Sequence, residues 1–395
     1  MNFERLRTLD REYIIQGGTR VPVDAHKGQG AVLFDLSGRE YIDFAGGGGI
    51  SSVGAAHPQW VRAVTTQAES LNCGSPDLYT QPAVRLAEEL CVRGGMAAAR
   101  FVSSGSEANE TMLKLARKYS YDRYGEDRGT VLTLKGGFYG HTLAALAASD
   151  GASGRPFDLS LTQFRSAEAD LEEIRAQGNS DVCAVMLELV QGNGVIPLPR
   201  HLIHDLTVYC AERDWLLLVD EVQTGAGRTG TLFAFQQYGI LPDVVSFAGG
   251  IAGGLPLGGV LTGNRCRQVL AGTGCGSTFG ENPICAAAAL AVLEILNEQE
   301  LSKVRERGNY LLTGIESLEL PQITAVRGVG LMIGLELAPG LNSREIVADL
   351  AVGGLLCLTW ERGLRFLPPL TVTKEEMDKG LAILKQILGN KEEAT

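Results

Sequence analysis

The stretch WLLLVDEVQTGAGRTG, residues 215–230, decides the fold. It begins as a continuous apolar run, places Asp220 and Glu221 side by side, and then turns into a glycine-rich loop. An apolar strand without polar alternation is typical of a parallel sheet that helices cover on both faces, because neither face meets water. Ligands of such sheets bind beyond the carboxyl ends of the strands, which is where the two acids lie. The stretch therefore predicts an α/β fold with a ligand site beside Asp220.

The surrounding sequence repeats this alternation of apolar strand, loop and helix. Expected strands lie at 99–104, 130–136, 181–190, 215–222, 243–249 and 258–263. Expected helices lie at 58–71, 80–94, 107–125 and 201–214, where apolar residues recur at helical spacing. Strands that alternate with helices in this way predict a mostly parallel sheet with helices on both of its faces.

The pattern changes toward the carboxyl end. Residues 281–318 read as one long helical region, and a shorter α+β pattern follows it. We expect an N-terminal arm and hairpin at 1–50, a large domain at 51–295 and a small α+β domain at 296–395.

Composition and charge narrow the class of protein. The formal net charge is -11, so a nucleic-acid or anionic-membrane partner is not expected, since both need a positive surface. No stretch approaches the ~20 apolar residues that span a bilayer, and the charged N-terminus lacks an apolar signal region. The 8 cysteines form no C-x-x-C pair and mostly lie in apolar runs, which favours reduced thiols and a cytoplasmic protein.

Two loops that precede helices predict phosphate binding. VSSGSEANE (102–110) places Ser-Gly-Ser before a helix, where unpaired N–H groups and the positive end of the helix dipole suit an anion. Ser104 or Ser106 could equally be an N-cap and nothing more. GCGSTFGENP (274–283) offers the hydroxyls of Ser277 and Thr278 in a similar loop.

Other candidate residues each have a structural alternative. Asp220 could pair with a cationic ring nitrogen, or it could cap a turn. Phe138 in LKGGFYGHT (134–142) could stack on a planar ring or belong to the core, and His141 beside it could contact a ligand or be structural. Arg365 in RFLPPL could bind a carboxylate, as arginine does in bidentate fashion.

Several other kinds of site are not expected. The 5 histidines show no HExxH or other metal-ligand spacing, so we expect no metal site. Neither a G-x-S-x-G elbow nor a Walker loop is present, so neither a serine hydrolase nor a P-loop nucleotide site is expected.

Taken in order, these motifs resemble the class III (subgroup II) aminotransferases of fold type I, which use pyridoxal 5'-phosphate (PLP). Within that family the sequence is most similar to the acetylornithine aminotransferases. The resemblance extends from GREYIDFAGG to GLAILKQILG, and these segments carry it: LYTQPAVRLAEEL, SGSEANE, LELVQGNGV, LLLVDEVQTGAGRTG, GGLPLGGVL, GSTFGENP, RGVGLMIGLEL and LRFLPPL. It implies a large domain built on a mostly parallel, seven-stranded sheet and a homodimer with shared active sites.

The resemblance also implies residue roles. Gly105 and Ser106 would hold the PLP phosphate, which Thr278 would reach from the partner subunit. Phe138 would stack on the pyridine ring and Asp220 would pair with its nitrogen. Val222 and Gln223 would lie beside the ring. Ser277 would contact the substrate, and Arg365 would bind its α-carboxylate.

Three positions depart from the family pattern. Gly249 stands where the family has the lysine that forms the Schiff base with PLP and moves the substrate proton. His141 replaces an arginine that grips a substrate carboxylate, and Asn193 replaces the glutamate that covers Arg365 in ornithine-type relatives, which predicts a permanently uncovered Arg365. Lys135 could substitute for the missing lysine, although active relatives often have a lysine there too. Three replacements indicate more than a single designed change: either a naturally diverged chain or a diverged chain that was also mutated.

The sequence thus leaves three functions open. The first is amino transfer from N2-acetylornithine or a related ω-amine to 2-oxoglutarate, in arginine biosynthesis, impaired because glycine can neither anchor PLP nor move a proton. The second is an inactive paralogue that binds PLP or a ligand and has a regulatory role. The third is a diverged PLP enzyme for another ω-amine, which His141 and Asn193 would permit.

Overall fold

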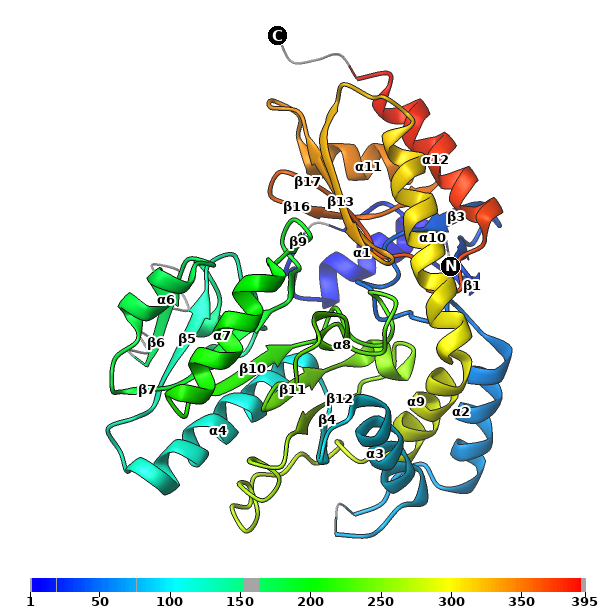
Figure 1. Cartoon of the computed structure of the whole chain (residues 1–395). Coiled ribbons are helices and arrows are strands. Elements are labelled where there is room, and N and C mark those ends of the chain that lie inside the picture. Colours follow the sequence, from blue (N-terminus) through cyan, green and yellow to red (C-terminus); the bar gives the residue numbers. More distant parts are fainter. Residues whose placement is uncertain (1, 19, 76, 152–162, 392–395) are drawn as a thin grey trace.

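The computed structural model describes residues 2–18, 20–75, 77–151 and 163–391 (Figure 1). Its large domain is built on a sheet of 7 strands in the order β4-β12-β11-β10-β7-β5-β6. The strands are β4 (Ala98–Val102), β5 (Thr130–Leu134), β6 (Phe164–Ala167), β7 (Val182–Glu188), β10 (Leu216–Asp220), β11 (Val244–Phe247) and β12 (Gly258–Thr262). Every residue of β5, β7, β10 and β11 is buried, as their apolar sequences predict.

The strand directions confirm the predicted, mostly parallel sheet, with one reversal. β10 is parallel to β7 and β11, and β5 is parallel to β6 and β7. β12 is antiparallel to both β11 and β4. A short connection of residues 248–257 joins β11 to β12, too short for a helical crossover between parallel strands.

The helices of the large domain are α2 (Pro58–Ser70), α3 (Gln81–Gly94), α4 (Gly105–Tyr124), α5 (Leu143–Ala148), α6 (Leu171–Gln177), α7 (Arg200–Glu212), α8 (Phe235–Tyr238) and α9 (Pro283–Ile295). They lie on both faces of its sheet, except that α2 packs on α9. A short hairpin of β8 (Val190–Gln191) and β9 (Ile196–Pro197) follows β7, and the 3-10 helix η1 (Gly249–Ala252) follows β11.

The predicted long helix at 281–318 is two helices, so that expectation is wrong. α9 ends at Ile295, and α10 (Glu298–Glu316) begins after Asn297, whose side chain accepts a hydrogen bond from the backbone N–H of Glu300. An asparagine N-cap starts a new helix because it satisfies one of the unpaired N–H groups of the first turn. The break lies beside the boundary that the sequence places between 295 and 296.

The C-terminal part forms an antiparallel sheet with helices against it. Its strand order is β13-β14-β17-β16, and its helices are α10, α11 (Ser343–Gly353) and α12 (Lys374–Leu388). The strands are β13 (Ile323–Val329), β14 (Met332–Leu337), β16 (Leu358–Trp360) and β17 (Gly363–Phe366).

The N-terminal segment is tied to this C-terminal part. α1 (Phe3–Tyr13) is followed by β1 (Lys27–Gln29), β2 (Val32–Phe34) and β3 (Glu40–Asp43), and β2 and β3 form the predicted hairpin. β15 (Leu355–Leu356) pairs in parallel with β3 and completes a sheet in the order β1-β2-β3-β15. The N-terminal hairpin therefore continues into a strand from the other end of the chain.

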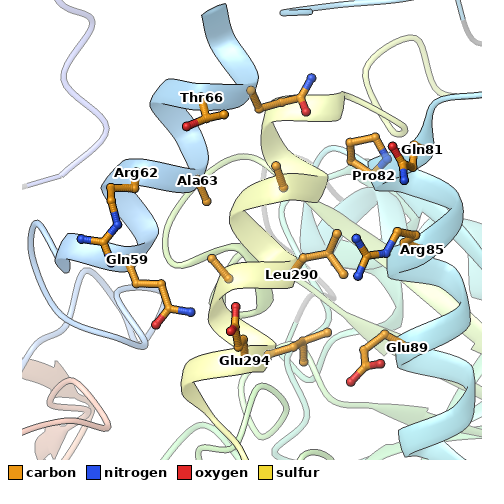
Figure 2. Close-up of a pocket in the computed structure, with 14 residues that line it drawn as sticks. Gln59, Arg62, Ala63, Thr66, Gln81, Pro82, Arg85, Glu89, Leu290 and Glu294 are labelled. Atoms are coloured by element: carbon orange, nitrogen blue, oxygen red, sulfur yellow. The ribbon is translucent and has the colours of Figure 1, made fainter. Parts of the chain in front are cut away.

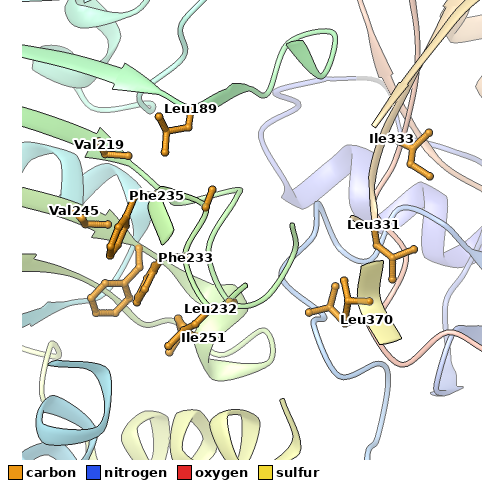
Figure 3. Close-up of a cluster of buried hydrophobic side chains, with 14 of the residues drawn as sticks. Leu189, Val219, Leu232, Phe233, Phe235, Val245, Ile251, Leu331, Ile333 and Leu370 are labelled. Atoms are coloured by element: carbon orange, nitrogen blue, oxygen red, sulfur yellow. The ribbon is translucent and has the colours of Figure 1, made fainter. Parts of the chain in front are cut away.

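One apolar core runs through both parts of the molecule. It joins residues of the large sheet such as Val219 and Val245 to Leu331 and Leu370 of the C-terminal part (Figure 3). At this junction the guanidinium of Arg228, only 2% exposed, donates hydrogen bonds to the carbonyls of Leu331, Pro368 and Gly49. The GAGRTG loop thus connects the large domain to both other segments.

Within the described part of the chain, no helix is long and apolar enough to cross a membrane. All of the cysteines there are free, and Cys183, Cys210, Cys266, Cys285 and Cys357 are buried. Cys73 is exposed, so the expected burial holds for most of the thiols and not for all of them.

Candidate active site

A cavity of about 660 Å³ lies beyond the carboxyl ends of β7 and β10. Its walls come from the start of α4, the loop 136–141, the turns after β7 and β10, and residues 359–365 of the small domain. Most of the predicted site residues line it together: Gly105, Ser106, Phe138, His141, Asn193, Asp220, Val222, Gln223 and Arg365.

Other predicted residues lie elsewhere. Ser277 and Thr278 line a separate depression with Arg100 and Glu281, although the Ser277 hydroxyl is 3.4 Å from that of Ser103. Gly249 lies at the start of η1, just beyond β11, and is not part of the lining. A single chain therefore brings together the other residues predicted to contact the ring and the substrate, whereas Ser277 and Thr278 lie apart from them.

Asp220 lies at the floor of the cavity with both carboxylate oxygens occupied. Oδ2 accepts a hydrogen bond from Asn109 Nδ2 at 2.7 Å. Oδ1 accepts one from the Val222 N–H at 2.8 Å and one from the Ser246 hydroxyl at 3.0 Å. These donors fix the orientation of the carboxylate, and burial raises its pKa. Asp220 therefore caps the turn at Val222, as one of the two alternatives had it, and it also lines the cavity, where a buried, oriented carboxylate suits a cationic ligand group.

Glu188 is a second acid at the same floor, which sequence reasoning missed. It ends β7 directly opposite Asp220 in the parallel ladder, and its oxygens accept from the N–H groups of Phe138 at 3.1 Å and Gly192 at 3.0 Å. Burial raises its pKa, and so does the nearby charge of Asp220, while Arg365 opposes the shift. The one signal in the sequence was a charged residue inside the apolar run DVCAVMLELV.

Glu221, in contrast, points away from the cavity. Its carboxylate accepts hydrogen bonds from the Thr224 hydroxyl and from the N–H groups of Ala234 and Phe235. Burial raises the pKa of Glu221 to about 7. Of the two neighbouring acids in the DEV motif, only Asp220 belongs to the site.

The first turn of α4 presents an anion site to the cavity. Ser104 is the N-cap, since its hydroxyl accepts from the Glu107 N–H at 3.2 Å. This leaves the N–H groups of Gly105 and Ser106 without a hydrogen-bond partner among the described residues. Unpaired N–H groups at the start of a long helix can bind a phosphate.

The loop 136–141 approaches this turn very closely. The Ser106 hydroxyl accepts a hydrogen bond from the N–H of His141 at 3.0 Å. Gly140 has φ +138, and a Cβ there would lie 2.5 Å from Ser106 Oγ, so only glycine fits. Beyond it, Phe138 is 46% exposed with its ring against the His141 ring, centroids 5.2 Å apart. Phe138 is therefore a wall of the cavity and not a core residue.

Arg365 is the cation of the cavity floor. Its Nη1 donates to the Gly192 carbonyl at 2.7 Å and to Gln223 Oε1 at 3.3 Å. The neighbouring Asn193 is exposed and makes no ion pair with it among the described residues. Arg365 thus has neutral hydrogen-bond partners on one side, and its permanent lack of an acidic cover stays a prediction of the sequence.

Three buried polar atoms in the lining have no partner among the described residues. They are Asn109 Oδ1, Trp360 Nε1 and Arg365 Nε. Buried polar atoms normally have partners. These three are themselves closed off from the open cavity, so they do not identify its ligand. Asn109 and Trp360 were missed in the sequence, where one reads as a helix residue and the other as part of the C-terminal α+β pattern.

The position of Gly249 can accept a side chain. A Cβ there would meet Ile50 at 3.4 Å and the Leu255 carbonyl at 3.6 Å, which are ordinary contacts, and its φ is not positive. Glycine is therefore not required by the backbone at this position. η1 begins just beyond the end of β11. β11 lies beside β10, and Ser246 of β11 is opposite Asp220 of β10 in the ladder.

No lysine lines the cavity, as far as the described residues extend. Lys135, the candidate substitute, is paired with Glu168 at 2.6 Å on the surface. Lys135 contributes only its carbonyl near the site, as the acceptor for Gln191 Nε2 at 2.6 Å.

The raised pKa of Glu188 makes a prediction about stability. The folded state holds its proton to higher pH than the unfolded chain, so the free energy of unfolding falls as pH rises from about 5 to 8. We expect Glu188→Gln to make the drop in the free energy of unfolding between pH 5 and pH 8 smaller by about 1–2 kcal/mol, as urea titrations at these two pH values would measure. Glu316→Gln, at an exposed position, is the control. Identical pH profiles for Glu188→Gln and the unmodified protein would contradict the raised pKa of Glu188.

A second hollow, of about 680 Å³, lies between α2, α3 and α9 (Figure 2). Arg62 and Arg85 on its walls are matched by Glu89 and Glu294, and its floor is largely alanine and leucine. It contains none of the predicted site residues and no orphaned buried atom among those described. The two hollows have similar volumes and differ in the chemistry of their lining residues. Among the described residues no cluster of side chains could hold a metal ion.

Comparisons with known proteins define the class. The model of the family "Aminotransferase class-III" matches residues 13–388, so the chain belongs to this family of PLP-dependent aminotransferases. The chain is 39% identical to an acetylornithine aminotransferase of Haemophilus ducreyi over 98% of this chain and 99% of that one. A second relative with the same name, from Methanocaldococcus jannaschii, is 37% identical over 98% of both chains.

Solved structures agree with this class. The ornithine aminotransferase of Toxoplasma gondii superimposes with a TM-score of 0.93 at 27% identity, over 98% of this chain and 95% of that one. The N-acetylornithine aminotransferase of Stenotrophomonas maltophilia gives a TM-score of 0.83 at 32% identity, over 97% and 98% of the two chains. The fold type I architecture expected from the sequence is confirmed.

Proposed function

We propose that this protein is an acetylornithine-type aminotransferase whose amino transfer is impaired because Gly249 leaves PLP without a covalent anchor. Its substrates would be N2-acetylornithine or a related ω-amine and 2-oxoglutarate, as in arginine biosynthesis. The observation that carries the proposal is a cavity whose lining includes residues that could hold the cofactor noncovalently and, among the described residues, no lysine. The names of the relatives support the substrate class.

The residues of the cavity fit PLP apart from this anchor. The N–H groups of Gly105 and Ser106 would bind its phosphate, and Phe138 would cover one face of its ring. Asp220, which Asn109 and Ser246 orient, would pair with the ring nitrogen. When bound, PLP supplies the electron sink that amino transfer requires. Val222 and Gln223 would lie beside the ring.

The substrate-facing residues would act on its charged groups. Arg365 would bind the α-carboxylate through its guanidinium. His141 and Asn193 stand at exposed positions of the lining, where the family has an arginine and a glutamate. These two replacements favour a second candidate function, the conversion of another ω-amine.

A homodimer belongs to the same proposal. Ser277 and Thr278 lie in a depression apart from the cavity, so they would serve the site of a partner subunit. Near them, Leu78, Tyr79 and Phe279 are 60%, 99% and 62% exposed. Large apolar side chains gathered at a surface are typical of a protein interface. A cytoplasmic location stays a prediction of the sequence.

The test is turnover of the PLP-saturated protein with a panel of ω-amines and 2-oxoglutarate. With N2-acetylornithine as the amino donor, we expect the turnover number for glutamate formation from 2-oxoglutarate to be at least 10²-fold below the ~10 s⁻¹ typical of enzymes. Turnover near 10 s⁻¹ would contradict the proposed impairment. Faster conversion of another ω-amine would favour the second candidate function.

His141 makes a prediction about the acceptor. In a Gly249→Lys background, His141→Arg should lower the KM for 2-oxoglutarate about tenfold, because a guanidinium binds a carboxylate through two hydrogen bonds. Pyruvate, which lacks the second carboxylate, is the control, and its KM should stay unchanged. An equal fall for both acceptors, or none, would show that His141 does not contact the distal carboxylate.

A further inference from the structure

We propose that Trp360, which lines the cavity from β16, selects substrates whose α-nitrogen carries an acyl group over amino acids with a free α-ammonium. The inference rests on the proposed function, in which Arg365 binds the α-carboxylate. It goes further because it assigns recognition of the neighbouring substrate group to one side chain of the small domain.

Trp360 and Arg365 lie side by side on one face of the small sheet. In the antiparallel ladder of β16 and β17, Leu358 is opposite Arg365 and Trp360 is opposite Gly363. Residues two apart along a strand share a face, so Trp360 and Arg365 are diagonal neighbours, which long and aromatic side chains can bridge. Both line the cavity. An α-carboxylate bound by Arg365 therefore places the other groups of its α-carbon within reach of Trp360.

Two glycines determine how the indole lies. A Cβ at Gly363 would lie 2.6 Å from Trp360 Nε1, and a Cβ at Gly194 would lie 3.5 Å from Trp360 Cη2. The indole thus lies over Gly363 and extends to the turn that carries Asn193. Its Nε1 is buried, so the polar edge is turned into the protein and the cavity meets carbon atoms of the ring.

The charges around the indole disfavour an ammonium group. The guanidinium carbons of Arg327 and Arg362 lie 5.9 and 5.8 Å from the centre of the ring. They engage the ring electrons that would otherwise attract a cation. Glu336 lies 2.8 Å from Arg327 and 3.8 Å from Arg362, so this carboxylate is already paired. Arg365 adds a further positive charge beside the ring.

An acyl group on the α-nitrogen suits these surroundings. Acylation converts the ammonium into a neutral amide, which is not repelled by the guanidinium groups. The carbon atoms of the acyl group can pack on the indole, whereas an ammonium in the same place would lose water without gaining a partner. Glu361, next to Trp360, could attract an ammonium, but it lies at an exposed position where water screens its charge.

The experiment compares N2-acetylnorvaline with norvaline. Both lack the ω-amine, so they report on recognition of the α-carbon end alone. Dissociation constants are measured by calorimetry at pH 7 with the cofactor-free full chain, because the PLP aldehyde would react with the free amine of norvaline. We expect the unmodified protein to bind N2-acetylnorvaline at least tenfold more tightly than norvaline.

Three variants assign this preference to the indole. Trp360→Leu keeps an apolar side chain without the flat ring, and it should remove most of the tenfold preference. Trp360→Phe keeps a flat ring and should retain most of it. Glu361→Gln is the matched control, since it changes the neighbouring charge and leaves the indole in place, and it should keep the preference.

The outcomes separate the inference from the proposed function. Equal binding of the two ligands by the unmodified protein, or an unchanged preference in Trp360→Leu, would overturn the inference and leave the proposed function standing. Undiminished binding of N2-acetylnorvaline by Arg365→Met would instead contradict the proposed place of the α-carboxylate. Binding of neither ligand by the unmodified protein would overturn both.

Discussion

Gly249→Lys should raise the rate of amino transfer from N2-acetylornithine by about 10²–10⁴-fold, the range that general acid–base catalysis typically contributes. The substitution supplies the amine that glycine lacks. The backbone accepts it, because a Cβ at 249 meets Ile50 and the Leu255 carbonyl at ordinary distances. The remaining contacts need no change, since Asp220 and the first turn of α4 are already in place. Single-turnover measurement of glutamate formation would give the rate.

Gly249→Met is the matched control for this prediction. It adds an unbranched side chain of similar length without a nucleophilic amine, so it should bring no gain. An equal gain with methionine would mean that filling space near Ile50 restores activity. No gain with lysine in a folded, PLP-binding protein would contradict the role assigned to position 249.

Arg228→Met should lower the free energy of unfolding by about 3–5 kcal/mol, because three carbonyls would lose a charged donor, at ~1–3 kcal/mol each. The methionine fills much of the same volume but donates no hydrogen bond. The carbonyls of Leu331, Pro368 and Gly49 would lose their donor at the junction of the domains. Buried Asp43 would also lose a nearby positive charge. Urea denaturation followed by tryptophan fluorescence would measure the change.

Arg362→Met is the control for Arg228. Arg362 is 70% exposed and lies 3.8 Å from Glu336, so its removal should cost less than ~1 kcal/mol. A similar loss of stability in both variants would show that Arg228 does not hold the domains together.

The sequence predicted the architecture well where apolar runs are long. β5, β7, β10 and β11 are fully buried strands, and their sequences contain no polar alternation that could suggest otherwise. The split of the helical region at Asn297 was missed because the apolar spacing continues on both sides of it. The pairing of β15 with β3 joins segments more than three hundred residues apart, which no local pattern reveals.

The site was predictable only in part. Glycine loops and the acid after β10 mark strand ends, and strand ends of a parallel sheet converge. Glu188 and Asn109 were missed because each lies inside an element that reads as structural, and only the ladder and the helix orientation bring them beside Asp220. Trp360 reaches the cavity from the small domain, so its role depends on how the domains pack.

The most direct test of the central claim is the intact mass of the unmodified protein after incubation with PLP and reduction with borohydride. Gly249→Lys, treated in the same way, shows that the reaction works. We predict no specific mass gain for the unmodified protein and a gain of one reduced cofactor for Gly249→Lys. A stoichiometric, fixed cofactor on the unmodified protein would contradict the claim, and peptide mapping would then identify the lysine that replaces the missing one.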